Sequence, residues 1–148
     1  MNADNRLVLR GLQLFFLALL TGLLLVASPP WVANPRGVLA GHLEGAMNAM
    51  FLMLVGLFYN RVGLSPTQSR ICRGTLLYSV FANWFFSTLS GILGAGDATP
   101  LAGAGHHASA IIEQLILVAL VSVALTMLIA VVLLLIGMRR AMAASPAA

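Results

Sequence analysis

Five polar residues within or next to long apolar runs are the first candidates for chemistry: His42, Asn48, Asn83, Ser87 and Glu113. Strongly polar side chains are costly inside a bilayer and usually mark function there. At about 1.5 Å of rise per helical residue, we predict that all five lie in one layer between the midplane and the outer side of a membrane, with Asn48 and Asn83 near the midplane. His106 and His107 lie in the loop above this layer, and we interpret them as exposed or substrate-entry residues.

His42 is the most informative of these residues, because imidazole is the usual ligand of haem iron, although a lone membrane histidine also serves as a structural hydrogen-bond donor. An electron-transfer cytochrome of the bis-histidine kind needs a second buried histidine, and the sequence has none at the same depth. If His42 binds iron, the opposite face of the metal stays open. Such an iron would act as a Lewis acid rather than as an electron carrier.

A ridge of small residues runs beside His42, with Gly37, Gly41, Gly45 and Ala49 spaced four apart. Ridges of this kind allow close packing of membrane helices. The ridge leaves room for either a flat cofactor or a neighbouring helix. Glu44 lies about 200° around the helix from His42 and cannot share its face; pairing with Arg36 and lining a subunit contact are both open to it.

The segment before residue 94 carries a second polar pattern. Thr75, Ser79, Asn83 and Ser87 recur every four residues and therefore form one stripe on a helix. Hydrogen bonding between helices accounts for Thr75 and Ser79. We interpret Asn83 as a functional residue, with Ser87 and the neighbouring Tyr78 as further candidates for substrate contact.

The elements that must position these residues are membrane helices. Of 148 residues, 60% are hydrophobic and 8% are charged, whereas a soluble domain has about 25% charged residues. We predict one all-α domain over residues 1–148, a four-helix transmembrane bundle with spans at about 8–28, 37–59, 74–94 and 108–138. The first span also resembles a signal peptide, but we count it as a retained helix. Residues 60–69 are predicted to be a polar turn.

The formal net charge of +4 comes from eight arginines, which sit at the ends of the apolar runs. They form no basic face, so nucleic acid is not an expected partner. All except Arg36 fall on one predicted side of the membrane. The excess of positive charge on that side predicts that both termini face the cytoplasm, in a multi-pass protein of the bacterial inner membrane.

Three segments together resemble the small four-helix membrane isomerases, the family of styrene oxide isomerase and hydroxylaminobenzene mutase. The segment from Gly41 to Asn48 resembles the family's His-x-x-Gly-x-x-Asn pattern. The segments Tyr78–Trp84 and Gly103–Ser109 are similar to its third-helix motif and to the entry of its fourth helix. The resemblance implies a homotrimer with haem b between subunits. It further implies that His42 is the axial ligand beside Gly41 and Gly45, and that Asn48 faces the substrate.

The expected reaction follows from this resemblance. Ferric haem would rearrange a small aromatic arylhydroxylamine to a 2-aminophenol without net redox change, while Asn48 and Asn83 orient the substrate, which reaches the site through membrane lipid. Ser79 and Ser87 stand where the epoxide isomerases have Asp and Tyr, which favours the hydroxylaminobenzene mutase reaction. Two alternatives remain open, an isomerase converting an epoxide to an aldehyde and a non-enzymatic exporter or assembly protein.

Overall fold

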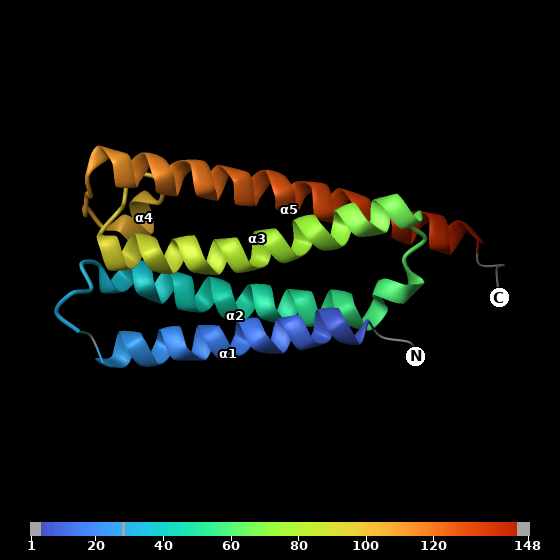
Figure 1. Ribbon diagram of the computed structural model, residues 1–148, viewed down its shortest axis with the longest axis horizontal. Helices are drawn as coiled ribbons and strands as arrows, with labels where there is room; N and C mark the ends of the chain where they lie inside the picture. Colours follow the sequence, from blue (N-terminus) through green and yellow to red (C-terminus); the bar gives the residue numbers. More distant parts are fainter. Residues whose placement is uncertain (1–3, 28, 145–148) are drawn as a thin grey trace.

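The computed structural model describes residues 4–27 and 29–144, and every long element in it is a helix (Figure 1). The elements are α1 (Asn5–Ala27), α2 (Pro35–Phe58) with a 3₁₀ turn at Tyr59–Arg61, α3 (Pro66–Leu93), a one-turn α4 (Pro100–Gly103) and α5 (Ala110–Ala144). Helices α1, α2, α3 and α5 are each long and apolar enough to cross a membrane. This confirms the predicted all-α fold with four spans. Residue 28, the predicted end of the first span, lies outside the described residues.

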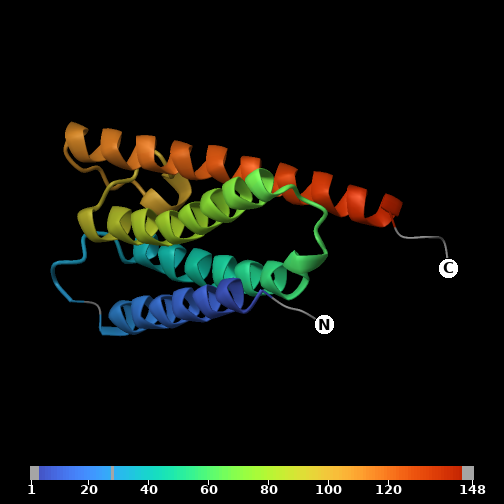
Figure 2. The same cartoon turned by 45° about the vertical axis from the view of Figure 1, so that its right-hand side comes forward.

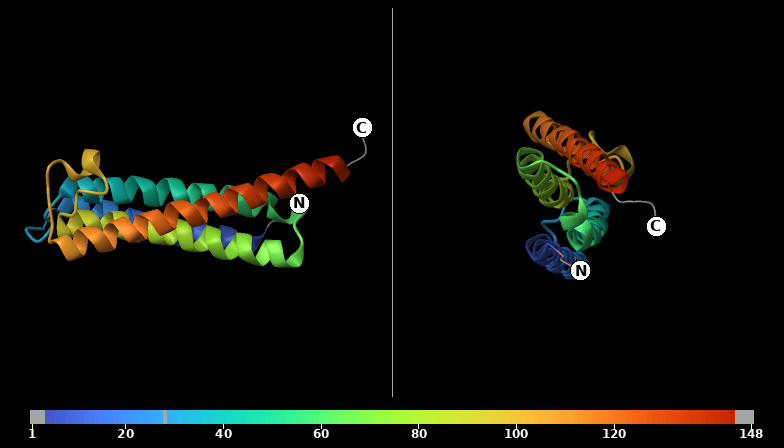
Figure 3. Two further views of the ribbon diagram at one scale, coloured as in Figure 1. Left: turned by 90° about the horizontal axis from the view of Figure 1, so that it is seen from above. Right: turned by 90° about the vertical axis from the view of Figure 1, so that its right-hand side faces the viewer.

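Each long helix packs mainly on its neighbour in the sequence, α1 on α2, α2 on α3 and α3 on α5 (Figure 2). Seen from the end, α5 lies on the far side of α3 from α1 (Figure 3). Helix α1 begins, and α5 ends, at one end of the molecule, the terminal end. The opposite end, the loop end, carries the 94–109 connection that contains α4.

Two helix boundaries differ from the predicted spans because polar residues extend helices past the apolar runs. Helix α3 begins at Pro66, eight residues before the predicted start at 74. Ser65 caps it, with Gln68 completing a reciprocal capping box and Pro66 at the first position. The predicted turn at 60–69 therefore shrinks to residues 62–65. Helix α5 continues past residue 138 to Ala144.

Close approach of glycines holds α2 against α3. A Cβ atom added at Gly91 would overlap the backbone of Gly37 and Val38, and one added at Gly41 would overlap Thr88. The backbones of α2 and α3 therefore touch near the loop end, as small residues allow in membrane helices. On the same face of α3, Trp84 packs against Gly45 of α2, and its indole N–H donates a hydrogen bond of 3.0 Å to Thr21 of α1. Trp84 of α3 therefore contacts both α2 and α1.

A polar cluster closes the terminal end. Asp4, 7% exposed, caps α1 and forms an ion pair with Arg73 of α3. The Arg73 guanidinium also lies over the ring of Tyr59, 4.5 Å from its centroid. The backbone N–H of Asp4 donates to the carbonyl oxygen of Gly56 at 2.7 Å. The start of α1, the end of α2 and the first turns of α3 are thereby joined.

Candidate active site

His42 lies on the face of α2 that meets α1. Its Nδ1 atom is 2.8 Å from the carbonyl oxygen of Ala18. Because a carbonyl can only accept, Nδ1 carries the proton and Nε2 keeps its lone pair. A Cβ atom on Gly22 would lie 2.9 Å from the ring carbon Cε1, so the absence of a side chain at residue 22 makes room for the imidazole.

This arrangement suits His42 for binding a metal. Metal-bound histidines usually donate the other ring N–H to a carbonyl or carboxylate, which sets the tautomer and the direction of the ring. The Nδ1–Ala18 bond provides that second contact. Within residues 4–27 and 29–144, no hydrogen bond or ion pair occupies Nε2. The donor set therefore fits the iron of a haem held by one histidine.

Gly41 and Gly45 do not line a space beside His42. Their missing side chains are replaced by Thr88 and Trp84 of α3, which fill the positions where Cβ atoms would lie. Of the two roles that the sequence left open for the ridge, the structure shows close helix packing. The contact of Gly41 and Gly45 with a cofactor stays a prediction, and within the chain α3 covers both glycines.

Glu44 lies on the opposite side of α2 and forms a hydrogen bond with Asn83, whose side-chain Nδ2 donates to Glu44 Oε2. Neither Arg36 nor any other cation in the described part of the chain forms an ion pair with this carboxyl group. Within the chain, an amide on the neighbouring helix thus takes the place predicted for Arg36, and a subunit contact of Glu44 stays a prediction. The sequence offered no signal for this pair beyond the shared depth of its two residues.

Asn48 lies one turn along α2 from Glu44, on the same face. Its Nδ2 atom is buried and has no hydrogen-bond partner within the described residues. Buried polar atoms are nearly always satisfied, so an unpartnered amide calls for a partner that the single chain does not supply. Asn48, Glu44 and Asn83 together form a polar cluster, which we call the amide cluster.

The other predicted contacts fall in two places. Ser87 is 7% exposed and lies one turn from Asn83 on the same stripe of α3. Tyr78 lies elsewhere: its hydroxyl is 2.6 Å from Ser122 Oγ, at an apolar groove of about 780 Å³ between α3 and α5. Ser79 is fully buried and donates to the Leu76 carbonyl of its own helix. Tyr78 therefore faces α5, away from the α2-facing side of α3 where Asn83 bonds Glu44.

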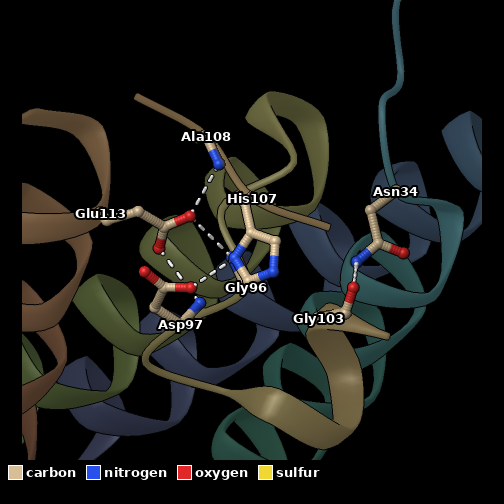
Figure 4. Close-up of polar contacts among 7 residues, drawn as sticks. All are labelled: Asn34, Gly96, Asp97, Gly103, His107, Ala108 and Glu113. Carbon is tan, nitrogen blue, oxygen red and sulfur yellow. Dashed lines mark hydrogen bonds and ion pairs between the residues drawn. The ribbon is translucent and has the colours of Figure 1, made fainter. Parts of the chain in front are cut away.

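Glu113 lies at the rim of the predicted polar layer, in the first turn of α5, and holds the loop end together (Figure 4). Its carboxylate accepts three backbone N–H groups, from Ala108 at 2.8 Å and from Gly96 and Asp97 at 3.1 Å each. Carboxylates near helix N-termini are favoured by the helix dipole. The glutamate is thus a loop anchor whose hydrogen-bond partners are backbone N–H groups, a role that its position before an apolar run could have suggested.

The same loop carries the two remaining histidines. His106 is exposed, and His107 is exposed with its Nδ1 2.6 Å from Asp97 Oδ1. Ligand atoms of Asp97, His107 and Glu113 lie within 4.8 Å of one another. Both carboxylate oxygens of Glu113 are already engaged by backbone N–H groups. Asn34 joins α2 to α4 at this loop end. Its side-chain Nδ2 donates to the carbonyl oxygen of Gly103 (Figure 4) and to that of Ala102.

The fold and site define a class: a multi-pass membrane protein of four apolar helices with a ligand-type histidine on one face of α2 and an amide cluster on the other. The family model for styrene oxide isomerase matches residues 3–139, and the chain belongs to that family.

Two curated relatives agree with this assignment. The chain is 42% identical over 138 residues to hydroxylaminobenzene mutase HabB of Ectopseudomonas oleovorans, covering 93% of this chain and 82% of that protein. It is 35% identical over 131 residues to hydroxylaminobenzene mutase HabA of the same organism, covering 88% and 94%. No solved structure matches the chain. The protein is therefore an enzyme of the isomerase and mutase class, and the alternative of a non-enzymatic exporter or assembly protein is set aside.

Proposed function

We propose that this protein rearranges hydroxylaminobenzene-type arylhydroxylamines to 2-aminophenols. The observation that carries this proposal is the 42% identity to hydroxylaminobenzene mutase HabB over 93% of the chain. Ser79 and Ser87, which stand at the positions where the epoxide isomerases were expected to have Asp and Tyr, add support. The reaction moves a hydroxyl group from nitrogen to the ortho carbon of the ring, so substrate and product have the same atoms and no external oxidant is needed.

We further propose that the cofactor is haem b with His42 as its axial ligand. When bound, ferric haem would supply a Lewis-acidic iron able to polarise the N–O bond of the substrate. The protein's own contribution is the direction of the imidazole. Ala18 accepts the Nδ1 proton, and the absence of a side chain at Gly22 lets the ring lie against α1 with Nε2 available.

The amide cluster is the proposed binding site for the polar group of the substrate. Asn48 offers a buried N–H that lacks a partner in the chain, which suits the oxygen of a hydroxylamine. Asn83 is bonded to Glu44, one helical turn from Asn48, and the buried Ser87 lies one turn further along α3 from Asn83. An arene that reaches this site from membrane lipid moves from one apolar environment to another, so transfer of its ring costs little free energy.

His42 and the amide cluster lie on opposite faces of α2, and this arrangement is relevant to how many subunits contribute to one site. One chain directs its histidine toward α1 and its Glu44–Asn83 pair toward α3. A site containing both therefore draws the histidine from one subunit and the amides from another. This division supports the expected homotrimer with haem between subunits, which crosslinking and mass measurement in detergent would test.

Two measurements test the proposed function. Membranes containing the protein should convert hydroxylaminobenzene to 2-aminophenol, and Asn48→Ala should lower the rate at least tenfold. The purified protein should show a Soret band that His42→Ala abolishes while the thermal unfolding transition is kept. Folded wild-type protein that is colourless after growth with added haem would refute the cofactor. Absence of 2-aminophenol would refute the reaction.

The second candidate is an isomerase that converts an epoxide to an aldehyde, favoured by the family model over residues 3–139. Turnover of styrene oxide to phenylacetaldehyde, with no 2-aminophenol from hydroxylaminobenzene, would establish it in place of the mutase.

The proposed location is the bacterial inner membrane with the terminal end in the cytoplasm. The support is the arginine distribution, since Arg36 alone lies at the loop end among the eight arginines. A reporter that is active only in the periplasm should be silent at the C-terminus and active when inserted near Gly105. The reverse pattern would overturn this orientation.

A further inference from the structure

Asn83 is held by Glu44 in one orientation of its amide. A carboxyl oxygen accepts hydrogen bonds, so the group of Asn83 that faces Glu44 is the NH₂, and the carbonyl oxygen Oδ1 is directed away. Asparagine amides that lack such a partner are free to turn over. Glu44 on α2 thus fixes which way the side-chain amide of Asn83 on α3 is turned.

The result is a pair of complementary groups. Asn48, one turn from Glu44 on α2, has a buried Nδ2 donor without a partner in the described chain. Asn83, opposite on α3, has its Oδ1 acceptor turned away from the carboxyl that holds its NH₂. A donor on α2, one helical turn from the residue that holds an acceptor of α3, matches a ligand that offers an acceptor and a donor in return.

The two candidate substrates, an arylhydroxylamine and an epoxide, differ in the hydrogen-bond donors that they offer. A hydroxylamine has an oxygen that accepts and N–H and O–H groups that donate, whereas an epoxide oxygen only accepts. Sites with a buried polar group that must be paired reject analogues lacking its partner by large factors, because the group is then left unsatisfied. An acceptor held at Asn83 therefore disfavours an epoxide.

We propose that Glu44 is a positioning and specificity-determining residue: by holding the NH₂ of Asn83, it presents Asn83 Oδ1 next to the unpartnered Nδ2 of Asn48 and selects arylhydroxylamines over epoxides. The inference rests on the proposed function. The second carboxyl oxygen of Glu44, Oε1, accepts no hydrogen bond within the described residues. Glu44 acts through Asn83 and is not assigned a contact with substrate.

The test compares two substitutions of Glu44, one that keeps a hydrogen-bond acceptor for Asn83 and one that removes it. Glu44→Gln keeps a side-chain carbonyl that can accept from Asn83, whereas Glu44→Leu removes every acceptor. For each variant, kcat and KM are measured with hydroxylaminobenzene, and Ki is measured for styrene oxide as a competitor. Thr75→Val is the matched control, because Thr75 lies in the same helix as Asn83 but its hydroxyl bonds only to its own helix.

We expect Glu44→Leu to lower kcat/KM for hydroxylaminobenzene at least tenfold while the Ki of styrene oxide stays within twofold of wild type. Glu44→Gln should retain activity within about threefold of wild type, and Thr75→Val should match wild type. If Glu44→Leu does not fold, Asn83→Leu, which removes the acceptor itself, replaces it with the same expected loss.

Three results would overturn the inference. One is equal loss of hydroxylaminobenzene turnover and styrene oxide binding in Glu44→Leu, which would show a purely structural role. Another is a Glu44→Gln variant as inactive as Glu44→Leu, and a third is full activity in both. If styrene oxide does not inhibit even the wild-type protein, the inference is judged from kcat/KM for hydroxylaminobenzene alone, which should be retained in Glu44→Gln and lost in Glu44→Leu. Wild-type protein that makes no 2-aminophenol would instead refute the proposed function, a result distinct from all three.

Discussion

The Nδ1 atom of His42 lies 2.8 Å from the carbonyl oxygen of Ala18 on the neighbouring helix. This carbonyl has its usual partner four residues on in α1, but a carbonyl oxygen has two lone pairs and can accept a second bond. The bond joins the candidate iron ligand to a different helix, so the direction of the ring depends on how α1 and α2 pack as well as on residue 42.

Gly22 should be required for this ring position. In Gly22→Ala, the new Cβ atom would lie 2.9 Å from Cε1 and 3.0 Å from Nδ1 of His42, so the ring must move and its bond to Ala18 must lengthen. Loss of such supporting contacts commonly weakens metal binding about 10–100-fold. We expect a correspondingly lower haem content, measured from the Soret absorbance per protein. Leu23→Ala, at an exposed neighbouring position, should not change it.

The contact between Gly91 and Gly37 should be intolerant of any side chain. Gly91→Ala would place a methyl group on the backbone of Gly37 and Val38, which cannot move aside as a flexible side chain can. We expect destabilisation of about 3 kcal/mol or more, seen as a large fall in Tm in detergent. Gly74→Ala in the same helix meets no atom within 4 Å and should be neutral or stabilising by up to about 1 kcal/mol. Equal Tm values for the two variants would contradict this account.

Glu113 should stabilise the loop end without supporting the rest of the fold. Glu113→Ala leaves the N–H groups of Gly96, Asp97 and Ala108 without their acceptor, at a cost of about 1–3 kcal/mol for a buried group. We expect faster amide hydrogen exchange and faster proteolysis within residues 94–109, with helix content unchanged. Asp97→Asn alters an exposed carboxylate of the same loop and serves as the comparison. Unchanged exchange in Glu113→Ala would remove the anchoring role.

Asp4 and Arg73 should be energetically coupled at the terminal end. Asp4 is buried, so Arg73→Ala leaves its carboxylate unpaired, whereas removing both partners relieves that cost. A double-mutant cycle with Asp4→Ala should give a coupling of about 1–3 kcal/mol in the free energy of unfolding. Arg70→Ala, at an exposed position one turn away, should have little effect. Strict additivity of the two single substitutions would show that the pair does not stabilise the fold.

The sequence was sufficient for the spans and for the depth of the polar residues. Runs of apolar residues near bilayer length predict helices whatever they pack against, since the backbone must satisfy its own hydrogen bonds in lipid. The rise per residue predicts Asn48 and Asn83 at similar depth, with His42 about 9 Å nearer the loop end. The bond between Glu44 and Asn83 agrees with the predicted meeting of polar residues from α2 and α3. The start of α3 was missed because apolar content alone cannot register a helix begun by Ser65 and Pro66.

The partner of each polar side chain was decided only by the tertiary structure. Periodicity states that His42 and Glu44 point in different directions, but it does not name the helix that either one meets. That choice depends on where backbones approach most closely, which glycines such as Gly41 and Gly91 permit at α2 and α3. Helical propensity and bilayer thickness are local properties that a single chain segment carries. Contacts such as those of His42 with Ala18 and Glu44 with Asn83 arise between segments, through packing that no single segment encodes.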